Sequence, residues 1–258
     1  MNMSLCFNRK LGERYKSLSQ RARVLTEGWV KKEVYCPNCG NVCLEQYSNN
    51  KPVADFYCRN CSEDFELKSK KDALGLKIVD GAYKSMLLRL AGENNPNFFL
   101  LNYEPQTYQV LNLLVIPKHF FVPDIIEQRK PLSMDAERAG WVGCNILLNK
   151  IPEVGRIFLV KDEQVESKER VQAVWQKTLF LREEKKVESR GWLLDIMRCI
   201  EQIRKKEFNL ADMYRFESFL ANQHPGNRHI KDKIRQQLQI LRDKNFIQFA
   251  GRGDYRLV

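Results

Sequence analysis

Four cysteines constrain the fold of this chain more than any other feature. Cys36 and Cys39 form one Cys-x2-Cys pair, and Cys58 and Cys61 form a second, with eighteen residues between the pairs. Two pairs at this spacing are typical of structural zinc, because four thiolates can close a tetrahedron around Zn²⁺. A redox pair or unrelated reduced thiols explain the double motif less well, and Cys43 lies off the pattern. The sequence therefore predicts a zinc-ribbon-type site with four cysteine ligands.

Residues 52–70 predict a β-hairpin that carries the second cysteine pair in its turn. Side chains alternate between the two faces of a strand. Glu66 and Lys68 therefore share one face, while Phe65 and Leu67 point into an apolar layer. Bound zinc would hold this hairpin together.

Asp55 lies eleven residues before Glu66, on or near the neighbouring strand, so strand pairing could bring their carboxylates together. Like charges repel unless a cation joins them, and Mg²⁺ takes oxygen ligands of this kind. The pattern Asp-x10-Glu-x-Lys is the form used by PD-(D/E)xK nucleases, in which a metal polarises phosphate and activates water. Asp55, Glu66 and Lys68 are therefore candidate catalytic residues.

The Glu-x-Lys pattern is weak by itself, because it recurs in charged segments typical of solvated surfaces. The other copies are Glu166/Lys168, Glu183/Lys185 and Glu184/Lys186. The copy at residues 66–68 differs because it alternates with apolar residues, follows an aspartate at strand distance and lies beside the cysteines. A catalytic role and a structural one both remain open on spacing alone.

The balance of charge points to a polyanionic partner. The net charge is +11 and the isoelectric point is near 9.3, and clustered Lys and Arg are the footprint of nucleic-acid binding. A basic protein without such a partner is the alternative. No apolar run approaches the roughly 20 residues that span a bilayer, and the first ten residues lack a secretory signal. We therefore expect a cytoplasmic protein with no membrane partner.

The first 181 residues predict a mixed α/β nuclease domain. The predicted helices are residues 17–32, 80–90 and 171–181, and the predicted strands are 98–103, 108–116 and 156–160. Glu27 lies on the first helix and could approach a metal, although a solvated position is favoured. Residues 129–143 predict a loop able to reach nucleic acid, with Arg138 and Trp141 as contacts. Trp141 could equally belong to the core.

Residues 182–258 predict a separate winged-helix domain, with residues 182–186 as the linker. Helices fit 191–204, 210–222 and 229–244, and strands fit 246–250 and 254–257. This segment has 17 Lys and Arg against 11 Asp and Glu, a net charge of +6. The predicted DNA-contacting residues are Lys231, Arg235, Gln236, Gln239, Arg242 and Arg252, because Arg and Gln read base edges. A winged helix used for protein contact is the alternative, and Gln237 falls near the apolar face without explanation.

Several long blocks of the chain resemble the DpnI family of restriction endonucleases. These blocks are residues 35–41, 52–58, 65–71, 138–141, 212–218 and 233–239. The resemblance runs almost the full length. It implies a PD-(D/E)xK catalytic domain followed by a winged helix, and Mg²⁺-dependent cleavage of double-stranded DNA at GATC when the adenine carries an N6-methyl group. The strict Pro-Asp pair is absent, since Val53 and Ala54 separate Pro52 from Asp55.

The resemblance also implies roles for the site residues. Asp55, Glu66 and the Leu67 carbonyl would hold Mg²⁺, and Lys68 would orient the attacking water and counter charge at phosphorus. We expect a monomer. A zinc-ribbon, winged-helix DNA-binding regulator without catalysis is the main alternative, and a repair or resolvase nuclease on the same core is a third.

Overall fold

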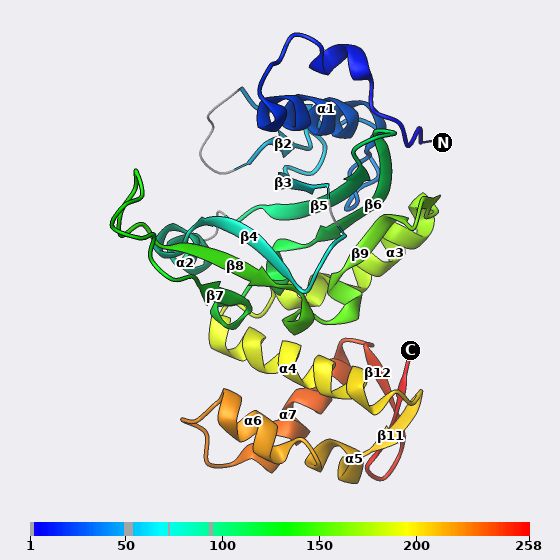
Figure 1. Cartoon of the computed structure of the whole chain (residues 1–258). Helices are drawn as coiled ribbons and strands as arrows, with labels where there is room; N and C mark the ends of the chain where they lie inside the picture. Colours follow the sequence, from blue (N-terminus) through cyan, green and yellow to red (C-terminus); the bar gives the residue numbers. More distant parts are fainter. Residues whose placement is uncertain (1–2, 49–53, 72, 93–94) are drawn as a thin grey trace. The chain divides into compact units, whose positions relative to one another are not determined.

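The computed structural model describes residues 3–48, 54–71, 73–92 and 95–258. They form two compact units, one from residues 1–149 and 154–178 and the other from residues 150–153 and 179–258 (Figure 1). Pro52 and Val53, at the start of the predicted hairpin, lie outside the described residues. Across the ranges described, no helix combines the length and apolar character needed to cross a bilayer.

The described residues of the first unit form two sheets and three α-helices. The larger sheet has the order β1-β2-β3-β5-β6-β9-β10, and the smaller has the order β4-β8-β7. The larger sheet comprises β1 (Glu45–Gln46), β2 (Phe56–Tyr57), β3 (Asp64–Lys70), β5 (Asn97–Glu104), β6 (Gln109–Ile116), β9 (Ile157–Lys161) and β10 (Gln164–Val165). The smaller comprises β4 (Lys77–Ala82), β7 (Ile126–Gln128) and β8 (Gly143–Leu147), and the helices are α1 (Leu18–Glu33), α2 (Tyr83–Ala91) and α3 (Lys168–Thr178).

The core of the larger sheet lies at β5 and β6, which read as nearly continuous apolar runs, as expected for strands covered on both faces. Residues 98–101 are fully buried. β3 runs parallel to β5 and antiparallel to β2. Phe65 on β3 stacks on Phe99 of β5 with ring centroids 4.7 Å apart, so the apolar face of β3 is fixed. The predicted hairpin, the first helix and the strands at 98–103, 108–116 and 156–160 are confirmed.

Two predictions in this unit need correction. Residues 80–90 do not form one helix, because residues 77–82 pair with β8 as strand β4 before α2 begins. Ile78 is buried in that pairing, so a tertiary contact overrides the helical spacing. The helix predicted at 171–181 begins and ends earlier, as α3.

The second unit has the predicted winged-helix layout, with helices followed by a β-hairpin. It comprises α4 (Val187–Ile203), β11 (Glu207–Asn209), α5 (Leu210–Tyr214), α6 (Glu217–Gln223), α7 (Ile230–Asp243), β12 (Ile247–Gly251) and β13 (Asp254–Leu257). The sheet order is β11-β13-β12. The sequence did not predict β11. The helix predicted at residues 210–222 is two helices, α5 and α6, which are separated at Arg215 and Phe216.

Candidate active site and metal centre

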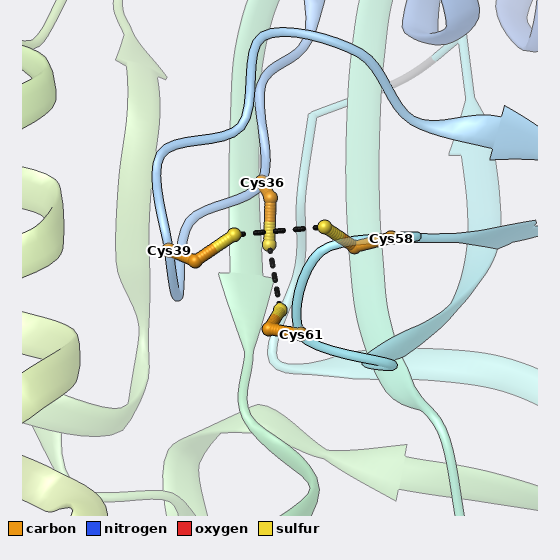
Figure 2. Close-up of side chains that lie close together, drawn as sticks. All are labelled: Cys36, Cys39, Cys58 and Cys61. Carbon is orange, nitrogen blue, oxygen red and sulfur yellow. Dashed lines mark hydrogen bonds between the residues drawn. The ribbon is translucent and has the colours of Figure 1, made fainter.

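The four predicted zinc ligands converge in the structure. The Sγ atoms of Cys36, Cys39, Cys58 and Cys61 all lie within 4.8 Å of one another (Figure 2). The Cys36–Cys61 distance is 3.5 Å and the Cys39–Cys58 distance is 3.6 Å. A tetrahedral ion with Zn–S bonds of about 2.3 Å separates its sulfurs by about 3.8 Å, so the cluster fits Zn²⁺. Cys43 is exposed and lies outside the cluster.

The turn that carries the first cysteine pair, residues 36–41, is closed by backbone hydrogen bonds and requires a glycine. The Gly40 amide donates to the Cys36 carbonyl at 2.8 Å, and Gly40 has φ of +73°. A Cβ at Gly40 would also lie 2.6 Å from Cε of Lys168 on α3. Gly40 therefore serves both the tight turn and the close packing of α3.

The thiols differ in how readily they give up a proton. Burial raises the pKa of Cys36 and Cys61. Burial also acts on Cys39, but hydrogen bonds from the Asn60 side chain and the Asn41 backbone lower its pKa to about 7. Because zinc binds thiolates, the lowered pKa of Cys39 favours the form of this residue that binds the ion.

The turn that carries the second cysteine pair connects β2 to β3, and the candidate acids Asp55 and Glu66 lie on either side of it. Cys58 follows β2 and Cys61 precedes β3. Asp55, just before β2, accepts a hydrogen bond at 2.7 Å from the Leu67 amide to its Oδ2 atom. Strand residues direct their amide and carbonyl to the same side, so the Leu67 carbonyl points toward the edge where Asp55 lies. The structure therefore brings Asp55 beside residues 66–68.

The environment of Asp55 disfavours a lone carboxylate. Burial raises the pKa of Asp55, the Leu67 amide opposes that shift, and the charge of Glu27 adds to it. Glu27 is buried, not solvated as the sequence favoured. Arg23 and Gln46 bind its two carboxylate oxygens at 2.6 and 2.8 Å. The positive charges of Lys68 and Arg23 act against this rise in the pKa of Asp55.

Glu66 and Lys68 share a face of β3, as the alternation predicted, and form part of a chain of ion pairs. The Lys68 ammonium lies 2.6 Å from Oε1 of Glu66 and 2.5 Å from Oδ1 of Asp80. Arg89 of α2 binds the other Glu66 oxygen at 2.8 Å. Burial opposes the charge on Lys68, but the two carboxylates outweigh it and raise the pKa of Lys68. Lys68 is therefore held as a cation.

Asp80 and Arg89 also belong to this group of ion pairs, although no sequence motif marks them. Asp80 was assigned to a helix, and Arg89 carried no motif. Asp55 accepts a hydrogen bond from the Leu67 amide, next to Glu66 on β3. The four cysteines differ, because their sulfur atoms themselves converge into one group of possible metal ligands.

Residues 129–142, which we call the β7–β8 finger, extend that strand pair beyond the sheet (Figure 1). The Arg129 amide donates to the Gly143 carbonyl at 3.0 Å, and the Leu132 amide donates to the Trp141 carbonyl at 2.9 Å. The predicted loop is therefore a hydrogen-bonded projection. Arg138 is exposed on it.

Trp141 is half-buried. A Cβ at Gly143 would lie 2.8 Å from the Trp141 ring, so the ring packs closely over the Gly143 backbone. Trp141 thus lies at the base of the finger and is neither a core residue nor a freely projecting one.

The predicted DNA-contacting residues of the second unit are carried by α7 and the wing. Four of these residues recur at helical spacing along α7 and border its buried side, which holds Ile234 and Leu238. This row, which we call the α7 stripe, consists of Lys231, Arg235, Gln239 and Arg242. Gln236 is exposed beside this stripe and accepts a hydrogen bond from Lys233 at 2.8 Å. Arg252 is exposed in the β12–β13 turn.

Tyr214 supports the stripe. Its hydroxyl accepts a hydrogen bond from Arg235 at 2.8 Å, and the Lys231 ammonium lies 5.4 Å from its ring centroid. Arg235 also pairs with Asp232. Gln237 is buried against the apolar side, where its Oε1 atom meets no donor among the described residues; the structure gives no physical reason for it.

Comparison with protein families agrees with both units. The Dam-replacing family, DpnI, matches residues 3–184, and the Dam-replacing HTH domain matches residues 188–257. The two matches leave only residues 185–187 uncovered between them. Together with the mixed α/β sheet, the four-cysteine cluster and the helix-turn-helix unit, they show that the chain belongs to the Dam-replacing, or DpnI, family.

Proposed function

We propose that this protein is a type II restriction endonuclease that cleaves double-stranded DNA at GATC when the adenine carries an N6-methyl group. Membership of the DpnI family supports a methyl-directed restriction endonuclease in general. The GATC sequence and the N6-methyl requirement come from the family resemblance. The observation that carries the nuclease assignment is the placement of Asp55, Glu66 and Lys68 around one segment of β3.

Asp55, Glu66 and the Leu67 carbonyl would hold Mg²⁺ in a PD-(D/E)xK arrangement. Bound there, Mg²⁺ would polarise the scissile phosphate and lower the pKa of a water molecule. The buried position of Asp55 and the nearby charge of Glu27 support a cation at this edge.

Lys68 would orient the attacking water and counter the charge that develops on the phosphate oxygens. Its ammonium has three donors and is held as a cation by two carboxylates. In-line attack by water would break the P–O3′ bond and leave a 5′-phosphate and a 3′-hydroxyl.

Zn²⁺ bound by the four cysteines would have a structural role. The four thiolates satisfy a closed tetrahedral site, which leaves no position for a reacting group. Cys58 and Cys61 bracket the turn between β2 and β3, so zinc would fix the strand that carries Glu66 and Lys68.

Both parts of the chain would recognise DNA, with residues 1–181 as the nuclease domain and residues 182–258 as the winged-helix domain. In the first, Arg138 and Trp141 of the β7–β8 finger are the proposed contacts. In the second they are the α7 residues Lys231, Arg235, Gln236, Gln239 and Arg242, together with Arg252 of the wing. The +6 charge of residues 182–258 supports this assignment.

The test is digestion of one plasmid in two forms, with and without N6-methyladenine at its GATC sites. Wild-type protein with Mg²⁺ is expected to cut only the methylated form, and a chelator is expected to stop the reaction. Glu66→Gln should be inactive, while Glu183→Gln, at an exposed Glu-x-Lys copy, should cut normally. Binding without cleavage under all conditions would contradict the proposal and support the non-catalytic regulator.

A further inference from the structure

We propose that Asp80 is a positioning residue that holds the Lys68 ammonium in place for phosphodiester cleavage. The inference rests on the proposed nuclease function and extends it to a residue of the second sheet. Its basis is the direct contact between Asp80 Oδ1 and Lys68 Nζ, at 2.5 Å.

Lys68 has two carboxylate partners, but they differ in what else they do. Glu66 also binds Arg89 and is a proposed metal ligand, so its carboxylate oxygens would be shared among Lys68, Arg89 and the metal. Asp80 forms an ion pair with Lys68 alone among the described residues. Its side chain is only 2% exposed, against 25% for Lys68. Asp80 is therefore the partner that can hold Lys68 independently of metal and DNA.

An irregularity in the pairing of β4 with β8 lies directly at Asp80. Asp80 pairs with Cys144 of β8, and the register shifts between Asp80 and Ala82. A bulge of this kind bends a strand and re-aims a side chain, often beside an active site. The contact therefore joins β4 of the smaller sheet to β3 of the larger one.

Fold stability alone gives little reason for this pair. The Oδ2 atom of Asp80 is buried and meets no donor in the described part of the chain, and burying a half-satisfied carboxylate is unfavourable. An apolar pair of similar size is often as stable as a buried ion pair. What the charged pair adds is a fixed location for the ammonium group.

Two other roles would place Asp80 differently. A DNA contact would require an accessible side chain, whereas Asp80 is almost fully buried. A direct metal ligand would have to release Lys68 first. Kinetics of a neutral variant distinguish all three roles.

The test begins with Asp80→Asn in the full-length protein, assayed on methylated plasmid DNA with Mg²⁺. We expect kcat to fall by about 10- to 100-fold, as when an outer group that orients a site residue is removed. KM and the Mg²⁺ concentration for half-maximal rate should be unchanged. Asp80→Glu, which keeps the charge, should retain more activity than Asp80→Asn.

The matched control is Glu127→Gln, which removes a carboxylate from the same three-stranded sheet. Glu127 lies 2.6 Å from Lys77, but that pair is far more exposed. Its kcat should equal that of the wild type. Unchanged kcat in Asp80→Asn would overturn the proposal, and so would a raised KM or Mg²⁺ requirement, which would assign Asp80 to DNA or metal.

A second measurement is independent of cleavage. Melting temperatures of the Mg²⁺-free protein are compared for Lys68→Met, Asp80→Asn and the double variant. Lys68→Met should lower the melting temperature because it leaves a buried carboxylate without its cation, and adding Asp80→Asn should recover much of the loss. Additive shifts would show that Asp80 does not hold Lys68. If wild-type protein cuts no DNA, the proposed function fails, yet this comparison still decides the pairing.

Discussion

The two units hold their charges in different ways. On the first, Lys68 and Asp80 form a pair whose side chains are 25% and 2% exposed. On α7 of the second, Arg235 and Asp232 form a pair whose side chains are 51% and 64% exposed. Solvent weakens an exposed pair until it contributes little to stability, whereas a buried pair is costly to break. The Lys68–Asp80 pair is therefore held in place within the first unit, whereas the Arg235–Asp232 pair on α7 remains accessible to solvent.

The second unit also holds a buried carboxylate, Asp195, which can be compared with Asp80 of the first unit. Asp195 binds Arg198 at 3.0 Å through one oxygen and His224 at 2.9 Å through the other, and the His224 ring stacks on Trp192 at 3.7 Å. Asp195 is fully satisfied, as expected for a structural group. Asp80 differs, because its Oδ2 atom is buried and meets no donor among the described residues.

The largest expected effect comes from the buried charges themselves. Glu66→Gln and Lys68→Met should each reduce cleavage by on the order of 10³-fold or more, because residues that act as a unit fail together. DNA binding should persist, because the proposed DNA contacts lie on the β7–β8 finger, on α7 and on the wing. The measurement is cleavage with Mg²⁺ beside a binding assay, with Lys185→Met as the matched exposed control. Normal turnover by either variant would remove that residue from the site.

The zinc site should give the next largest effect. A zinc site with four cysteine ligands contributes on the order of 10 kcal/mol to folding, so Cys58→Ser should sharply lower the melting temperature and the zinc content. Cys43→Ser, which changes an exposed thiol outside the cluster, should change neither. Metal analysis that finds well under one zinc per chain in unchelated wild-type protein would refute the structural role.

The exposed charges of α7 should affect DNA affinity and leave the fold intact. Arg235→Ala should weaken binding by about 1–3 kcal/mol if it contacts a base edge, and relax preference at one position. Lys244→Ala, outside the stripe and paired with Glu183 at 2.5 Å, should have little effect. Titration of the full-length protein with methylated and unmethylated GATC duplexes at two salt concentrations measures this. Equal weakening on all sequences, with a shallower salt slope, would instead indicate a phosphate contact.

The smallest expected effect is a gain in stability. Because burial raises the pKa of Asp55, the ionised carboxylate is disfavoured in the folded protein at neutral pH. Asp55→Asn should therefore raise the melting temperature of Mg²⁺-free protein slightly while it abolishes cleavage. Gln46→Ala, which removes a donor to Glu27, should not stabilise. A lower melting temperature for Asp55→Asn would show that Asp55 supports the fold.

Local sequence patterns were sufficient to predict the features that depend only on residues close together in the chain. The spacing of Cys36, Cys39, Cys58 and Cys61 predicted a cluster that the structure assembles. Alternation along β3 predicted that Glu66 and Lys68 share a face, and the apolar stripe of α7 predicted its buried side. Each of these features follows from the period of one strand, helix or turn.

Tertiary structure alone decided which distant groups meet. The sequence favoured solvent for Glu27, but its buried position depends on Gln46 from another element. It assigned Asp80 to a helix, whereas pairing with β8, a strand far along the chain, makes that segment a strand. Whether Asp80 lies beside Lys68 depends on how two sheets pack, and no periodicity within either strand encodes that contact.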